Sequence, residues 1–309
     1  MASAEILVLG AVLSFVFGWN NSSYLIGSGE GSGSLTLREA LLISSAGLFL
    51  GAVLEGPKMI DSLSGSVTPD AGGQVVLVAL LVSLCLCASL SLVKLPVSFS
   101  MAMVGAFAGA AYASALPLNA SRLEEVAGFW FLAPVLAALL AFLFYRIILK
   151  SAPRLSLLAL DGASRYGVIL TSFIVAYVLG ANNVGLIYGA VTNGGPSSET
   201  EIILLVVIAI AGMVALGRGG VSGTVGDRML GLSPFGVVAT FLSSAVLIGL
   251  GTQLAIPVSI TQCLLGGMFG AALTKQISVV NGRLATESIA LWVAVPIGAF
   301  ILAFVFFGL

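Results

Sequence analysis

Long hydrophobic runs separated by short polar segments follow one another along almost the whole chain. Most runs are close to the roughly 20 residues that a helix needs to cross the hydrocarbon core of a bilayer. They lie at 5–26, 36–54, 74–93, 96–116, 124–149, 166–188, 198–216, 234–253, 256–274 and 286–308. The pattern therefore predicts an all-α polytopic membrane protein.

Two polar motifs interrupt hydrophobic runs, and each motif occurs twice. Residues 18–23 (GWNNSS) return as 180–185 (GANNVG), and residues 96–100 (PVSFS) return as 257–261 (PVSIT). The offset is 162 residues for the first motif and 161 for the second. Two motifs repeated at nearly one offset indicate that a single unit has been duplicated.

Each copy of this unit holds five hydrophobic runs. A unit with an odd number of crossings begins its second copy on the opposite side of the membrane, so the copies are predicted to be inverted repeats of about five spans each, with broken or half-helices near the midplane. We place the first repeat at 1–150, a cytoplasmic linker at 151–165 and the second repeat at 166–309.

The positions of Lys and Arg predict the orientation, because cytoplasmic loops gather these residues. With the amino terminus outside, ten of the twelve basic residues fall on the cytoplasmic side, and only Lys58 and Arg122 remain outside. The ten are Arg38, Lys94, Arg146, Lys150, Arg154, Arg165, Arg218, Arg228, Lys275 and Arg283. We therefore predict a protein integral to the cell membrane with both termini external.

Composition narrows the function. Hydrophobic residues make up 59% of the chain, charged residues make up 8%, and histidine is absent. Since histidine is the commonest general base and the commonest zinc ligand, an enzyme, a metal site and a bound cofactor are not expected. Scattered basic residues and a net charge of −1 give no indication of nucleic acid binding.

Each copy of the first motif places two asparagines inside a hydrophobic run, close to Gly18 or Gly180. Buried amides are costly in a membrane unless they find partners, and glycine weakens a helix, so we predict a helix interruption in both copies. The polar groups that an interruption frees can bind an ion or an anion. The alternative is that these side chains only join neighbouring helices through hydrogen bonds.

Proline opens the second motif in both copies, at Pro96 and Pro257. Since proline suits the first turn of a helix, we predict a half-helix here, whose first-turn hydroxyls and free N–H groups bind an anion. An ordinary helix cap of proline and serine is the alternative. Glycine pairs at GxxxG spacing follow and predict close helix packing. These pairs are Gly105 with Gly109 and Gly266 with Gly270.

The two motifs together predict a substrate site built from uncharged side chains. Its members are Asn20, Asn21, Ser22, Ser98, Ser100, Asn182, Asn183, Ser259, Thr261 and Gln262. The pattern resembles the inorganic phosphate transporter (PiT) family, which includes phosphate carriers and bacterial sulfate permeases. That family carries a GANDVAN motif twice, where 18–24 and 180–186 stand here, and PVSTTH motifs, matched by 96–101 and 257–262. The resemblance covers nearly the whole chain.

Several positions depart from the family pattern. Asn21 and Asn183 stand in place of its two aspartates, Leu48 in place of a glutamate, and Met101 and Gln262 in place of its histidines. Sulfate offers only acceptor oxygens, whereas phosphate near neutral pH keeps protons that need an acceptor. A neutral donor set therefore favours sulfate, and the family's sulfate permeases also lack the paired aspartates.

We thus predict a secondary-active permease that imports a tetrahedral oxyanion by alternating access, with sulfate preferred and phosphate as the alternative. Uptake into a negative-inside cell requires cation coupling. Protons acting through Glu55 or Asp61 are preferred, and sodium held by asparagines and carbonyls is the alternative. An anion channel and a transporter-like receptor are the rival functions. The expected partners are the transported ion, the lipid bilayer and a second copy of the chain in a homodimer.

Overall fold

The regular structure of the chain is entirely helical wherever the computed structural model describes it. The described residues are 4–27, 30, 32–63, 67–68, 71–93, 95, 97–151, 156–192, 198–216, 232–275 and 282–308. Predictions for Lys94, Pro96, Arg154, Arg218 and Arg228, and for the side chains of Lys275 and Arg283, fall outside them. The predicted all-α class is confirmed.

The five long hydrophobic runs of the first half and those of the second half each form helices, with short additional helical segments at different places. The first half contains α1 (Ala4–Leu25), α3 (Leu37–Glu55), the 3₁₀ helix η1 (Gly56–Ser62), α4 (Gly73–Leu92), α5 (Phe99–Ala113) and α6 (Ala120–Ser151). The second contains α7 (Leu157–Leu179), the π-helical turn η3 (Gly180–Val184), α8 (Gly185–Thr192), α9 (Glu199–Leu216), α11 (Pro234–Gln253), α12 (Ile260–Lys275) and α13 (Gly282–Phe307). Most of the predicted linker at 151–165 is helical, because α7 begins at Leu157.

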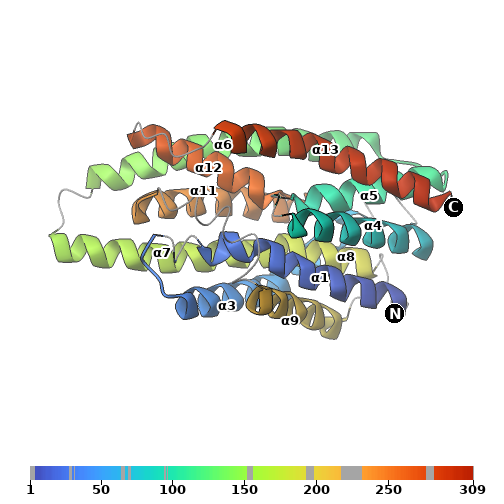
Figure 1. Cartoon of the computed structure of the whole chain (residues 1–309), viewed down its shortest axis with the longest axis horizontal. Coiled ribbons are helices and arrows are strands. Elements are labelled where there is room, and N and C mark those ends of the chain that lie inside the picture. The colour runs from blue at the N-terminus through green and yellow to red at the C-terminus, as the bar shows by residue number, and fades with distance from the viewer. Residues whose placement is uncertain are drawn as a thin grey trace.

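Figure 1 shows the inversion directly. Helix α1 and its counterpart α7 run in opposite directions along the long axis, and the amino end of α1 lies at the same end of the molecule as the carboxyl end of α13. Seven helices of the described chain are long and apolar enough to cross a membrane. The predicted architecture of two inverted repeats is confirmed.

Helices α5 and α12 are shorter than a full span, with 15 and 16 residues. At 1.5 Å per residue they reach roughly 24 Å, less than the hydrocarbon core of about 30 Å. Residues 97–98 before α5 and 256–259 before α12 are not helical and carry the serines of the Pro-Val-Ser motifs. The fourth hydrophobic run of each half is therefore a half-helix, as predicted from the proline.

The interruption predicted at Gly18 is wrong, because α1 continues as an α-helix through Gly18 to Leu25. Asn21 and Ser22 donate to carbonyls of their own helix and so keep the turn closed. At Gly180 the helix widens into the π-helical turn η3 and does not break. Gly18 instead permits close packing, since a Cβ there would overlap the carbonyl of Ala209 on α9.

Helices of the two halves pack as exchanged pairs, in which one helix of the first half contacts one helix of the second half. Helix α1 packs on α9, α3 on α7, α5 on α13 and α6 on α12. The predicted GxxxG packing is confirmed in the last two pairs, because a Cβ at any of the four glycines would overlap a backbone carbonyl of the partner helix. These contacts join Gly105 to Pro296, Gly109 to Phe300, Gly266 to Pro134 and Gly270 to Ala138. Neither half is therefore a separate folding unit.

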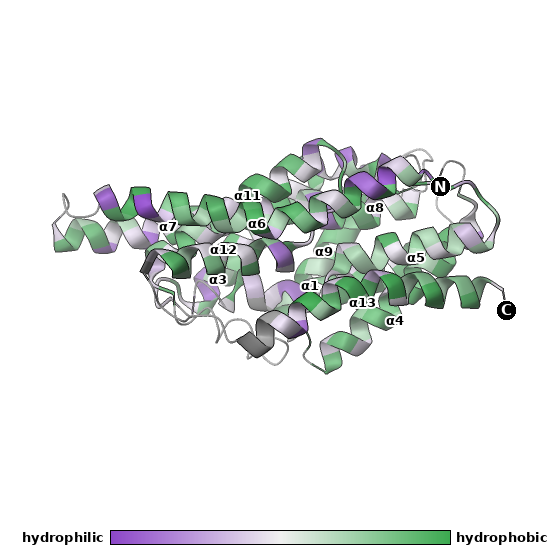
Figure 2. Ribbon diagram, turned by 90° about the horizontal axis from the view of Figure 1, so that it is seen from above, coloured by the Kyte–Doolittle hydropathy of each residue, from purple (hydrophilic) through white to green (hydrophobic). Residues whose placement is uncertain are grey.

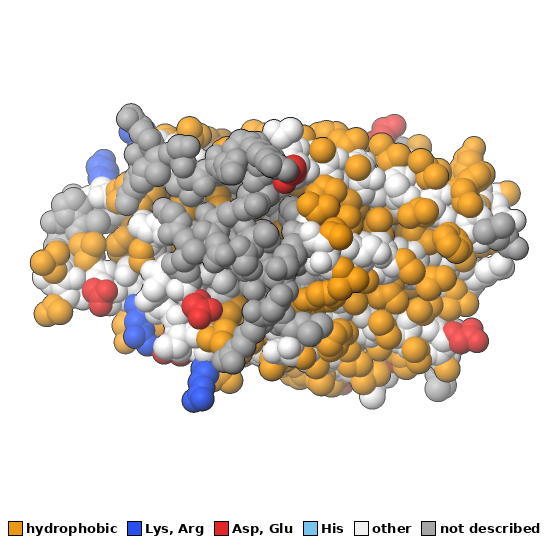
Figure 3. Space-filling model, viewed as in Figure 1, with side chains coloured by type: hydrophobic (Ala, Val, Ile, Leu, Met, Phe, Trp, Pro, Cys, Tyr) orange, Lys and Arg blue, Asp and Glu red, His pale blue; other side chains and the backbone are white. Residues whose placement is uncertain are grey.

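The outer surface is largely hydrophobic, as expected of a protein that lies in a membrane. Hydrophobic residues follow most of the length of the helices (Figure 2) and cover a broad area of the face in Figure 3. The Lys and Arg side chains visible on that face lie toward the end opposite the chain termini. This asymmetry agrees with the predicted orientation, although which side of the membrane holds the termini stays a prediction.

Candidate functional site

The two Pro-Val-Ser motifs meet inside the protein. Ser98 Oγ donates a hydrogen bond of 2.9 Å to Ser259 Oγ, and both side chains are at most 2% exposed. Ser98 is the N-cap residue of α5, and Ser259 immediately precedes α12. The starts of the two inverted half-helices therefore face each other at this pair of hydroxyls.

More hydroxyl and N–H groups gather around Ser259. Its Oγ lies 2.8 Å from Thr261 Oγ1 and accepts a weaker bond of 3.4 Å from the backbone N–H of Gln262. Ser100, the counterpart of Thr261 in α5, is buried, and its hydroxyl has no partner among the described residues. Two helix starts thus supply hydroxyls and first-turn N–H groups, which is the arrangement that binds anions.

Asn182 and Asn183 have different environments although they are adjacent in η3. Asn182 Nδ2 donates to Ile256 O at 3.0 Å and to Thr252 Oγ1 at 3.2 Å, and its Oδ1 accepts from Val258 N–H at 2.9 Å. Asn183 is 1% exposed, and its Nδ2 has no partner in the described part of the chain. Asn182 therefore holds the turn before Ser259, and Asn183 has an amide donor available for a ligand.

The first repeat shows the same division in part. Asn20 Nδ2 donates to Ser91 Oγ at 2.8 Å, and Ser91 is the counterpart of Thr252 at an offset of 161. Asn21 Nδ2 instead donates to Phe17 O, and Ser22 Oγ to Trp19 O, both within α1. The predicted site residues of α1 are therefore buried, and each of them donates a hydrogen bond within the protein. The amide N–H group without a partner among the described residues is that of Asn183 in the second repeat.

Glu55 takes part in a separate cluster that joins the two halves. Its Oε2 lies 3.2 Å from Lys58 Nζ and accepts from Gln253 Nε2 at 2.7 Å, while its Oε1 accepts from Tyr177 OH at 3.1 Å. Lys58 also donates to Gln253 Oε1. This carboxylate is thus engaged by a cation and two neutral donors at the carboxyl end of α3. The partners of Glu55 in this cluster do not include either of the paired serines.

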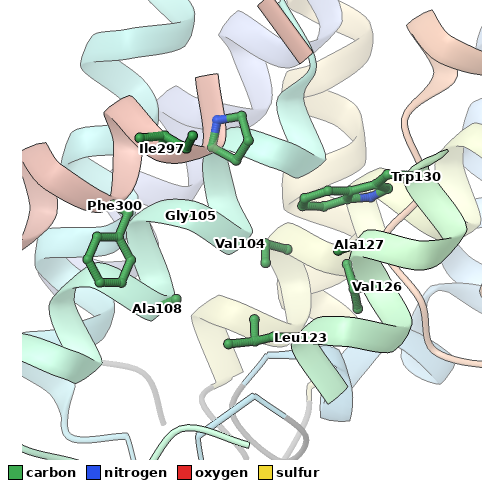
Figure 4. Close-up of a pocket in the computed structure, with 10 residues that line it drawn as sticks. Val104, Gly105, Ala108, Leu123, Val126, Ala127, Trp130, Ile297 and Phe300 are labelled. Carbon is green, nitrogen blue, oxygen red and sulfur yellow. The ribbon is translucent and has the colours of Figure 1, made fainter. Parts of the chain in front are cut away.

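Gln262 lines a cavity of about 190 Å³ between α6, α12 and α13, together with Met101, Trp130 and Trp292. Its Oε1 is buried without a partner among the described residues, so this cavity has one unpartnered acceptor. A larger cavity of about 310 Å³ lies between α5, α6 and α13 (Figure 4). Apart from the indole of Trp130, its lining side chains are all apolar, so it offers nothing to bind an oxyanion.

Two residues at the site were missed by the sequence reasoning. Trp130 Nε1 donates to Pro257 O at 2.8 Å, and Arg122 Nη2 donates to Leu254 O and Ala255 O. Trp130 recurs as Trp292 at the 162-residue offset of the repeat. That recurrence is a signal for Trp130, whereas the sequence predicts for Arg122 only a position outside the membrane.

The site as a whole is neutral and rich in hydrogen-bond donors. The hydroxyls of α5 and α12 and the amide of Asn183 are each buried, and the starts of the two half-helices add N–H groups. In a low-dielectric interior such groups can replace the hydration shell of a small anion. No group of three or more carboxylates, histidines or cysteines able to hold a metal occurs within the described ranges.

Comparisons with known proteins identify the family and the fold. The model of the family described as "Phosphate transporter family" matches residues 17–161 and again 158–303. A Methanocaldococcus jannaschii protein described as "putative phosphate permease" is 27% identical over 305 residues, which cover 97% of this chain and 95% of that protein. A Bacillus subtilis protein described as "probable low-affinity inorganic phosphate transporter" is 26% identical over 98% of this chain and 95% of its own. A solved structure, described as a sodium-dependent phosphate transporter, superposes with a TM-score of 0.85 and 18% identity, over 98% of this chain and 97% of its own.

Proposed function

The chain belongs to the phosphate transporter family, and from this premise we propose that it carries inorganic phosphate across a membrane with sodium as the coupling ion. The observation that carries the proposal is the contact of Ser98 with Ser259, because it brings the anion-binding starts of both inverted repeats to one buried place. The family match and the relatives described as phosphate permeases or transporters supply the substrate.

The preference for sulfate is not supported by these comparisons, and phosphate, the alternative, has the better support. The residue types alone predict a site made of hydrogen-bond donors, and this is the reason for preferring sulfate. Hydroxyls also accept hydrogen bonds, and Gln262 Oε1 adds a buried acceptor without a partner among the described residues. A protonated phosphate can therefore donate its own O–H group to this site, which removes the reason for preferring sulfate.

Sodium replaces the proton as our preferred coupling ion. The proton hypothesis rested on Glu55 or Asp61, and the carboxylate of Glu55 is already engaged by Lys58, Gln253 and Tyr177. Sodium is a hard cation that suits hydroxyl, amide and carbonyl oxygens, which the site provides. The similar solved structure is described as sodium-dependent, which supports the same choice.

Transport in this proposal proceeds by alternating access. The paired serines and Asn183 hold phosphate while the surrounding helices open first to one side of the membrane and then to the other. Because helices of the two halves pack as exchanged pairs, each moving body contains helices from both repeats. We propose no enzymatic activity for this site.

Uptake of radiolabelled phosphate by proteoliposomes tests the proposal. We expect saturable uptake driven by an imposed sodium gradient, exchange with unlabelled phosphate on the other side, and little inhibition by excess sulfate. A potassium gradient of equal size is the control. Sulfate uptake that phosphate does not inhibit would restore sulfate as the substrate, and uptake that rises linearly with concentration would indicate a channel.

A further inference from the structure

The segment between α11 and α12 is held by side chains from two other elements. Four consecutive carbonyls, those of residues 254–257, each accept a hydrogen bond from a side chain. Arg122 Nη2 donates to Leu254 O at 2.9 Å and to Ala255 O at 2.8 Å, Asn182 Nδ2 to Ile256 O at 3.0 Å, and Trp130 Nε1 to Pro257 O at 2.8 Å. Because non-helical backbone inside a membrane protein must find partners, these donors permit the segment to exist there.

The backbone of this segment is also strained. Ala255 has a φ of +53°, in the left-handed region that residues with a Cβ seldom adopt. Such a conformation is energetically costly and persists only where the surroundings fix it. The backbone bond from Ile256 N–H to Gly251 O, 2.7 Å long, closes the end of α11 around Ala255, and Arg122 adds bonds to the carbonyl of Ala255 and to the one before it.

The held segment leads directly into the site. Val258 donates to Asn182 Oδ1, and the next residue, Ser259, contacts Ser98 and Thr261. An error in the path of residues 254–258 would therefore move the hydroxyl of Ser259. A displacement of about 1 Å is enough to weaken a hydrogen-bonded site strongly.

Two of the three donor residues lie on a helix that packs tightly against α12. Arg122 and Trp130 both lie on α6, and α6 packs on α12 at Gly266 and Gly270 without room for a Cβ. Because these backbones are in contact, Arg122 and Trp130 are held at a fixed place relative to the start of α12.

We propose that Trp130 and Arg122 are positioning residues that fix the backbone in front of Ser259 so that its hydroxyl binds phosphate. This inference rests on the proposed phosphate site. Neither residue contacts the substrate in this account; each acts through carbonyl groups of the segment.

The repeat provides a matched control for Trp130. Trp292 is its counterpart on α13, but Trp292 Nε1 has no hydrogen-bond partner among the described residues. Both indoles line the cavity that also contains Gln262. Figure 4 shows Trp130 at the edge of the apolar cavity, so replacing it with phenylalanine keeps an aromatic ring there and removes the N–H group.

Arg165 is the control for Arg122. Its guanidinium pairs with Glu39 at 2.7 Å, so its replacement also removes an arginine that forms an ion pair.

The test compares Trp130→Phe with Trp292→Phe, and Arg122→Gln with Arg165→Gln, in sodium-driven phosphate uptake. We expect Trp130→Phe and Arg122→Gln to raise the KM for phosphate about fivefold, with the maximal rate within about twofold of wild type. The two control variants should keep the wild-type KM. Equal KM values for Trp130→Phe and Trp292→Phe would overturn the proposal, as would a loss confined to the maximal rate.

A second measurement keeps this test separate from the proposed function. Hydrogen–deuterium exchange over residues 254–260 should be faster in Trp130→Phe than in wild type or in Trp292→Phe. Absence of phosphate uptake by the wild-type protein would contradict the proposed function, and the exchange measurement would still decide whether Trp130 fixes this segment. Unchanged exchange in Trp130→Phe would overturn the positioning role.

Discussion

The hydroxyls of Ser98 and Ser259 lie 2.9 Å apart although 161 residues separate them in the chain. They are equivalent residues of the two repeats, so their contact lies where the inverted halves meet. A site at this place receives the start of one half-helix from each repeat. This explains how a duplicated chain forms a single binding site from two copies of the same short motif.

Adjacent asparagines in η3 are expected to respond differently to truncation. Asn182→Ala leaves the Val258 N–H and the Ile256 carbonyl without their partner, which should cost about 1–3 kcal/mol of stability for each buried group. Asn183→Ala removes a donor that has no partner among the described residues, so it should preserve thermal stability and reduce phosphate uptake. Melting curves in detergent and uptake assays check the pair. A greater loss of stability in Asn183→Ala would contradict the assignment.

Helix packing provides a second comparison. Gly270→Ala places a Cβ where the carbonyl of Ala138 lies, so α6 and α12 must separate and we expect a loss of about 1–3 kcal/mol. Gly128→Ala on α6 is the control, because a Cβ there meets no atom within 4 Å. The melting temperature should fall in the first variant and not in the second. Equal melting temperatures would mean that the two helices tolerate a wider spacing.

Glu55→Gln separates a structural role from a coupling role. The carboxylate pairs with the partly exposed Lys58, and an exposed pair of this kind contributes about 0–1 kcal/mol. We therefore expect the variant to fold and to keep uptake driven by sodium. The measurement is phosphate uptake by proteoliposomes at one phosphate concentration and a series of sodium gradients. Loss of sodium dependence in this variant would show that Glu55 belongs to the coupling site.

Much of the fold could be predicted from the sequence because a membrane imposes simple rules. The hydrophobic runs located the helices, and the repeated prolines marked the half-helices that begin after Ser98 and Ser259. The exchange of helices between the halves could not be predicted, since a glycine such as Gly18 indicates close packing without naming its partner. A glycine inside a hydrophobic run can either weaken the helix or allow another backbone to approach it. At Gly18 the second of these occurs, so the predicted helix break is wrong.

The sequence predicts which residues form the site, but it does not predict which of them bond to the protein and which are available to the substrate. The repeated motifs identified both asparagine pairs, and only the structure separates the engaged Asn182 from the available Asn183. Trp130 and Arg122 lie outside those motifs and bond to carbonyls of a distant segment. A contact between a side chain and a remote backbone leaves no pattern in residue types, so it requires the structure.

Calorimetric titration of the purified protein with phosphate in the presence of sodium tests the central claim most directly. We predict that wild type binds phosphate and that Ser98→Ala and Ser259→Ala each weaken binding about tenfold or more, since each removes a hydrogen bond to a charged ligand. Phosphate affinity equal to wild type in both variants would contradict a site at the meeting point of the two repeats.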